Sequence, residues 1–180
     1  MRTLPTLTER ETMEINLFDT DTIRANEPMS YKATSTVYAT RSVPTILTNT
    51  EYCPEYKTSG SAGADLKVNV SVVLNPNSSQ VVTTGVRLAI PDGFVGLVFP
   101  RSGLASKGIT LANSVGVIDS DYRGEIQLAM VNNSANTVQL NAGDRVAQIV
   151  FLPVTQFPFV IQTTLDSTTR GTGGFGSTGV

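Results

Sequence analysis

Residues with branched Cβ atoms dominate this chain and restrict the folds that it can adopt. Threonine, valine and isoleucine account for 53 of the 180 residues, and their side chains favour a pleated sheet over a helix. From about residue 43 onward they form short alternating runs. The run 81–90 ends at Pro91-Asp92-Gly93, a typical turn sequence. Such strands, spaced about ten residues apart without a sustained helical period, predict an all-β antiparallel sandwich, jelly roll or barrel.

The composition changes along the chain and divides it into three parts. Its 180 residues are enough for about one domain, which we expect to occupy residues 43–165 with one short helix at 102–107. Residues 1–42 combine charges of both signs with weak periodicity, so we expect a partly disordered N-terminal extension. Residues 166–180 contain five glycines, and we expect a flexible C-terminal arm that orders on a ligand.

Charge and residue types exclude several classes of function. The net charge of −2 lacks the basic excess of a nucleic-acid-binding protein. The absence of histidine excludes imidazole bases and imidazole metal sites. A carboxylate, ahead of Cys53, lysine or tyrosine, is therefore the candidate general base. No segment reaches the ~20 apolar residues of a membrane span, and residues 1–25 lack the apolar block of a secretory signal. We expect a soluble, cytoplasmic protein that binds neither membrane nor nucleic acid.

Two strand ends carry side chains suited to phosphate. Arg101, Ser102 and Gly103 follow an apolar run, where a guanidinium, a hydroxyl and backbone N–H groups can bind an anion. The same residues also fit an ordinary turn with a solvated arginine. Arg145 and Gln148 lie three positions apart, so an ideal strand points them to opposite faces. We expect Gln148 to orient a water or a phosphate oxygen, and Arg145 to form an inter-strand ion pair.

The densest polar stretch lies between two predicted strands and ends at Glu125. Asn113 can read the Watson–Crick edge of a base, because its amide both donates and accepts hydrogen bonds. Tyr122 could lie against a sugar and leave no room for a 2′-hydroxyl. Asp119 follows two apolar residues, so we expect its carboxylate to be partly desolvated and more basic. An acidic hairpin turn without a ligand fits the same residues.

The acidic residues do not have the spacing of a metal site. Asp65 stands near a glycine turn and, taken alone, fits a structural role. No group of Asp and Glu residues has the pattern of a protein metal cage, so we expect any metal to arrive with the substrate.

Taken in order, five segments resemble the five motifs of the trimeric dUTP pyrophosphatases (dUTPases). They are residues 61–66, 100–105, 117–125 with Asn113 upstream, 143–150 and 170–179. Any one motif is weak, whereas five in this order are specific; residues 1–42 have no counterpart. The resemblance implies a jelly-roll-like β-clip subunit in a homotrimer whose three active sites lie between subunits. It also implies that the C-terminal arm closes over a neighbour's site.

The resemblance further implies hydrolysis of dUTP to dUMP and pyrophosphate, which keeps uracil out of DNA and supplies dUMP for dTMP synthesis. Mg²⁺ would enter on the triphosphate, without a direct protein ligand. The catalytic residues would be Asp119, which activates the attacking water, Ser102, Gln148 and Asp65. The substrate-binding residues would be Arg101, Ser102, Gly103, Asn113, Gly116, Val117, Asp119, Tyr122, Gln148, Arg170, Phe175, Gly176, Ser177 and Thr178.

Two other functions remain as alternatives. A dCTP deaminase of the same fold shares the arginine–serine turn, but it typically carries a second serine where this chain has Gly103. It also lacks a hairpin like the one that holds Asp119. A nucleotide-gated regulator could keep all five motifs and use residues 1–42 to capture a protein partner of unknown identity.

Overall fold

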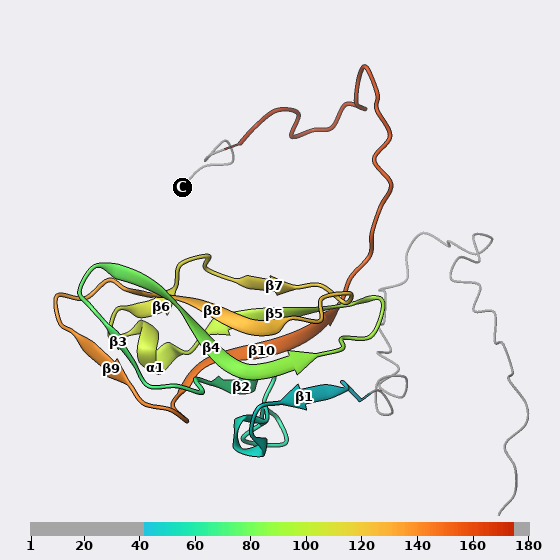
Figure 1. The fold of residues 1–180 in the computed structure, drawn as a ribbon. Coiled ribbons are helices and arrows are strands. Elements are labelled where there is room, and N and C mark those ends of the chain that lie inside the picture. Colours follow the sequence, from blue (N-terminus) through green and yellow to red (C-terminus); the bar gives the residue numbers. More distant parts are fainter. Residues whose placement is uncertain (1–41, 175–180) are drawn as a thin grey trace, which may run out of the picture. The chain divides into compact units, whose positions relative to one another are not determined.

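Ten strands and two short helical segments make up residues 42–174, the part of the chain that the computed structural model describes (Figure 1). These residues belong to the second of two units, 1–40 and 41–180, into which the chain divides. In chain order the elements are β1 (Thr45–Leu47), η1 (Thr50–Tyr52), β2 (Ala64–Lys67), β3 (Val72–Leu74), β4 (Ser78–Leu88), β5 (Phe94–Pro100), α1 (Ser102–Ala105), β6 (Ile109–Leu111), β7 (Gly116–Ile118), β8 (Glu125–Asn132), β9 (Val138–Leu140) and β10 (Arg145–Pro153).

The strands form two four-stranded sheets and one two-stranded sheet. Their orders are β1-β4-β8-β6, β2-β10-β5-β7 and β3-β9, and every pair is antiparallel. Strands that are far apart in sequence are neighbours in space: β10 lies between β2 and β5 (Figure 1). The predicted all-β, jelly-roll-like antiparallel fold is confirmed. Because β10 follows β2 by some eighty residues in the chain, distant segments can contribute to one site.

The core lies between the inner faces of the two larger sheets. Along β8, Ile126, Leu128 and Met130 are buried at alternate positions, as expected for a strand with one face inward. They belong to one apolar cluster with Leu66 of β2 and Ile149 of β10. Burying each such side chain contributes about 1.5–3 kcal/mol. This packing fixes β2 and β10, and therefore the polar side chains on their other face.

The helix predicted at 102–107 forms, but it is shorter. Residues 102–105 are helical, and the chain continues as a turn to Gly108. Gly108 has φ of +82°, a conformation that favours glycine and ends a helix. The short helix starts directly after β5, an inner strand of the β2-β10-β5-β7 sheet.

The chain after β10 carries no strand or helix between residues 154 and 174. Its large apolar side chains are exposed; Phe159 and Ile161, for instance, are fully accessible. Residues 1–41 and 175–180 lie outside the described residues. The predicted domain boundaries at 42/43 and 165/166 stay predictions.

Candidate active site

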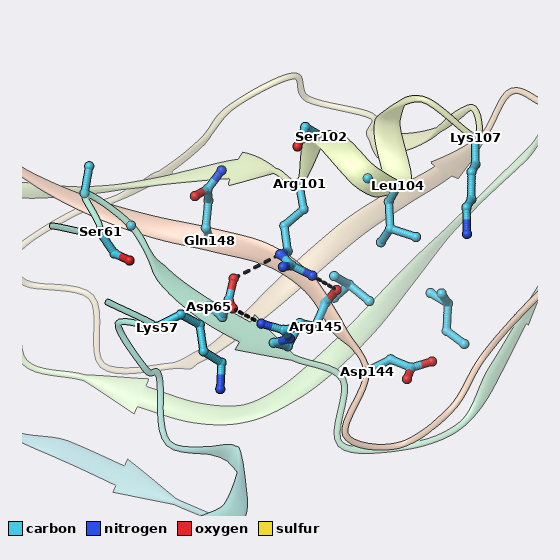
Figure 2. Close-up of a pocket in the computed structure, with 15 residues that line it drawn as sticks. Lys57, Ser61, Asp65, Arg101, Ser102, Leu104, Lys107, Asp144, Arg145 and Gln148 are labelled. Atoms are coloured by element: carbon cyan, nitrogen blue, oxygen red, sulfur yellow. Dashed lines mark hydrogen bonds and ion pairs between the residues drawn. The ribbon is translucent and has the colours of Figure 1, made fainter. Parts of the chain in front are cut away.

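A cavity of about 690 Å³ opens where β2, β10, the start of α1 and the loop before β2 meet (Figure 2). Five residues predicted to bind or act on the substrate line it: Asp65, Arg101, Ser102, Gly103 and Gln148. They come from three separate segments of the chain. The sheet order explains their meeting, because β10 pairs with β2 on one side and with β5 on the other.

Asp65 stands at the centre of an ion-pair network in this cavity. Its Oδ1 lies 3.0 Å from Arg101 Nε, and its Oδ2 lies 3.0 Å from Arg145 Nη1. Arg101 Nη1 also donates to the backbone carbonyl of Arg145 at 3.0 Å (Figure 2). Only 9% of the Asp65 side chain is exposed. Desolvating a carboxylate costs several kcal/mol unless opposite charges replace the water, and the two guanidiniums supply that compensation here.

The prediction that Arg145 and Gln148 point to opposite faces is wrong. Arg145 pairs with Lys67 and Ala147 with Leu66, so β10 has one extra residue at this point. A β-bulge of this kind shifts the alternation by one position. Both side chains therefore line the same cavity. The predicted inter-strand ion pair of Arg145 is present, but it lies inside the site.

The Gln148 side chain occupies space that a glycine on the neighbouring segment leaves free. Its Nε2 donates to the carbonyl of Pro100 at 3.3 Å. A Cβ at Gly63 would lie 2.7 Å from Gln148 Oε1, well inside van der Waals distance. Gly63 therefore leaves the space that the carboxamide occupies, a role that no pattern in the sequence indicated.

The cavity carries a positive charge. Four cationic side chains, Lys57, Arg101, Lys107 and Arg145, line it together with only two carboxylates, Asp65 and Asp144. A concave site with this excess attracts a polyanion, and arginine binds phosphate oxygens in a fixed geometry. Lys57, Lys107 and Asp144 were not predicted to lie in the site, since isolated charges in loops have no distinguishing pattern.

The residues of the polar hairpin lie outside this cavity. Gly116 and Val117 belong to β7, an edge strand that pairs only with β5, and Asp119 follows it. Asp119 is exposed, so the predicted desolvation of its carboxylate does not occur within one chain. Asn113 is exposed as well, and the Tyr122 side chain is about half exposed. A position at a sheet edge explains the exposure of Asp119, because no strand within residues 42–174 pairs with the other side of β7.

Of the residues predicted for the C-terminal arm, only some lie in the part of the chain that the structure describes. Arg170 is exposed, and its Nε donates to the carbonyl of Gly173 at 3.0 Å. It does not line the cavity. Four further residues predicted to bind the substrate lie outside the described residues: Phe175, Gly176, Ser177 and Thr178.

The described residues contain neither a metal-binding cluster nor a helix that could span a membrane. Within residues 42–174, no three His, Cys, Asp or Glu side chains gather as a metal site would require. Asp65 is engaged by two arginines, and Asp144 Oδ2 accepts from the backbone N–H of Asn141 at 2.8 Å. Among the same residues, no helix is long and apolar enough to cross a membrane.

Comparison with known proteins agrees with the motifs. The dUTPase family model matches residues 50–179. A deoxyuridine 5′-triphosphate nucleotidohydrolase from Cutibacterium acnes is 49% identical over 140 residues, which covers 77% of this chain and 91% of that protein. A dUTPase of Staphylococcus bacteriophage 80alpha, a mutant solved with dUpNHpp, aligns with a TM-score of 0.72 and 27% identity over 78% of this chain and all of the other.

A second solved structure, a mutant dUTPase from phage phi11 of S. aureus, aligns with a TM-score of 0.65 and 26% identity. It covers 71% of this chain and all of the other, and its description reports a structural Mg(II) ion. Sequence, motif order and fold therefore lead to one assignment, and the predicted family is confirmed: this chain belongs to the dUTPases.

Proposed function

We propose that this protein is a dUTP diphosphatase that hydrolyses dUTP to dUMP and pyrophosphate in a homotrimer with shared active sites. The activity is the one for which the similar proteins are named. The observation that carries the proposal is the charged cavity around Asp65 and Arg101, in which four cationic side chains suit a triphosphate.

The groups that would complete this cavity lie on the hairpin, exposed to solvent. One chain thus holds a phosphate-binding half and, apart from it, a carboxylate, an amide and an aromatic ring. A closed symmetric trimer can bring the cavity of one chain against the hairpin of the next, because each interface of a cyclic assembly joins two different patches. The same packing would cover Asp119 and remove it from bulk water.

In the proposed reaction, each group has a defined role. The Asp119 carboxylate would accept a proton from the water that attacks the α-phosphorus, and the O–P bond to the pyrophosphate group would break. A general base contributes about 10²–10⁴-fold to the rate. Arg101, the backbone N–H groups of Ser102 and Gly103, and Gln148 would bind the phosphate oxygens and offset the charge that develops on the leaving group.

The remaining contacts would make the enzyme selective for dUTP. Asn113, with backbone groups of Gly116 and Val117, would hydrogen-bond to uracil, and Tyr122 would pack on the deoxyribose. A site of specific hydrogen bonds rejects a mismatched base because its buried groups lose their partners. Arg170, Phe175, Gly176, Ser177 and Thr178 would close over the triphosphate and the base, as parts of an arm at 166–180.

Mg²⁺ would enter with the nucleotide as part of the substrate. It prefers phosphate oxygens and retained waters, and the two carboxylates in the cavity are already hydrogen-bonded. When bound, it would neutralise part of the charge on the triphosphate. A cytoplasmic location and a protein partner for residues 1–42 belong to the same proposal.

A pyrophosphate-release assay with Mg²⁺ and dUTP, dTTP, dCTP or UTP tests the activity. We expect rapid release from dUTP and at least a hundredfold slower release from the others, a ratio that hydrogen-bond readout can supply. Release of ammonia from dCTP would indicate the deaminase, which the comparisons do not favour. Light scattering on the purified protein should give the mass of three chains. A monomer without activity on dUTP would contradict the proposal.

A further inference from the structure

The ring of Tyr122 is held against the start of a strand. Its hydroxyl donates to the backbone carbonyl of Glu125 at 3.0 Å, and Glu125 is the first residue of β8. The Glu125 carboxylate in turn accepts from the backbone N–H of Gly85 in β4 at 2.6 Å. The ring is thus fixed to the body of a sheet, although its own residue belongs to an exposed turn.

Gly124 provides the space that this ring occupies. A Cβ at Gly124 would lie 2.3 Å from Tyr122 Oη, 2.5 Å from Cζ and 2.9 Å from Cε2, whereas carbon atoms in contact lie about 3.5–4.0 Å apart. Gly124 is not among the residues with positive φ, so its backbone conformation is open to any residue. Glycine is therefore required at position 124 because any larger side chain would overlap the Tyr122 ring.

The turn that carries the ring has its own supports. The backbone N–H of Tyr122 donates to the carbonyl of Asp119 at 3.2 Å. Arg123 Nη1 donates to the carbonyls of Ser120, at 2.6 Å, and Tyr122, at 2.9 Å. None of these bonds involves the phenol. A methyl group at Gly124 would therefore displace the ring and leave the turn, with Asp119, in place.

We propose that Gly124 determines sugar specificity by holding the Tyr122 ring in the position that leaves no room for a ribose 2′-hydroxyl. The inference rests on the proposed function, because it concerns how the same site separates dUTP from UTP. It assigns to Gly124 a role in selectivity and none in the chemical step, since the glycine contacts neither the reacting atoms nor the proposed base.

A double-mutant cycle tests this role. The quantity measured is the ratio of kcat/KM for dUTP to kcat/KM for UTP, in the full-length protein. We expect Gly124→Ala to lower the ratio about tenfold or more, the scale of a lost steric contact. Tyr122→Ala should lower it similarly. If glycine acts through the ring, Gly124→Ala should change the ratio less than about twofold in the Tyr122→Ala background.

Gly60→Ala is the matched control, because a Cβ there meets nothing within 4 Å and the φ of Gly60 is not positive. In this variant the ratio of kcat/KM for dUTP to kcat/KM for UTP should equal that of the wild type. An unchanged ratio in Gly124→Ala, an equal fall in both backgrounds, or the same fall in Gly60→Ala would each overturn the inference.

A crystal structure of Gly124→Ala gives a readout that does not depend on activity. The ring should leave the carbonyl of Glu125, while the bonds from Arg123 to the turn remain. A ring in its original place would overturn the inference even if the enzyme is active. If the wild type fails to hydrolyse dUTP, the proposed function fails instead, and this structure still decides whether Gly124 positions the ring.

Discussion

The cavity and the hairpin of this molecule are built in opposite ways. In the cavity, Asp65 is almost fully enclosed and contacts two arginines, and Gln148 lies on β10 between two neighbouring strands. On the hairpin, Asp119 follows an edge strand and faces solvent. The binding half is thus organised within one chain, whereas the half that would do the chemistry is exposed. We propose that association of chains, rather than folding of one chain, completes the site.

Removing the proposed base should give the largest effect. In Asp119→Asn we expect kcat for dUTP to fall about 10²–10⁴-fold, because the amide cannot accept the proton. The affinity for dUTP, measured by calorimetry, should change little, since the phosphate-binding groups are on the other half. The midpoint of urea unfolding should also stay the same. The Asp119 carboxylate is exposed and forms no hydrogen bond or ion pair within the described residues, so it contributes little to stability. Normal turnover would show that another group is the base.

Removing the central carboxylate of the cavity should lower both the stability of the fold and the affinity for dUTP. Asp65→Asn leaves two guanidiniums without their shared partner, each side chain about one-third to two-fifths exposed. Solvent would screen part of the loss, so we expect destabilisation of about 1–3 kcal/mol, measured by urea unfolding. The affinity for dUTP should fall as well. Stability equal to that of the wild type would remove the contrast between an organised cavity and an exposed hairpin.

The smallest effect concerns the rim of the cavity, where Lys57 pairs with Glu55. Lys57 donates a hydrogen bond to the Glu55 carboxylate and lowers the pKa of Glu55 below its ordinary 4.5. A lowered folded-state pKa means that the pair stabilises the fold above that ordinary value and that this contribution is lost as the pH falls through the lowered one. Glu55→Gln should therefore reduce the Tm slightly at pH 7 and by less at pH 3. A decrease of equal size at both pH values would contradict this reading.

The sequence predicted the class of fold and five of the residues that line the cavity, Asp65, Arg101, Ser102, Gly103 and Gln148, for identifiable reasons. Alternation along β8 reflects one buried face, and turn residues separate the strands. Asp65, Arg101 and Gln148 were assigned because their motifs occur in a specific order. The roles of the hairpin and arm residues remain predictions, because they depend on contacts beyond one chain.

The features that were missed depend on register and on space. Predicting side-chain directions from alternation in the sequence assumes that strands pair residue for residue. The bulge before Ala147 breaks this pairing, so the Arg145 side chain lies on the opposite face of the sheet from the one predicted. Likewise, the glycines at 63 and 124 are explained by side chains that meet them from other positions. Desolvation of Asp119 was predicted from its apolar neighbours, but those neighbours belong to an uncovered edge strand.

Mixing two inactive variants tests most directly whether the cavity of one chain works with the hairpin of another. Arg101→Ala disables the cavity and Asp119→Asn the proposed base, and each should be inactive alone. When the two are co-expressed in equal amounts, random assembly places an intact cavity against an intact hairpin at about one site in four. We predict about a quarter of the wild-type activity on dUTP. No recovery in mixed trimers confirmed by mass spectrometry would contradict the account.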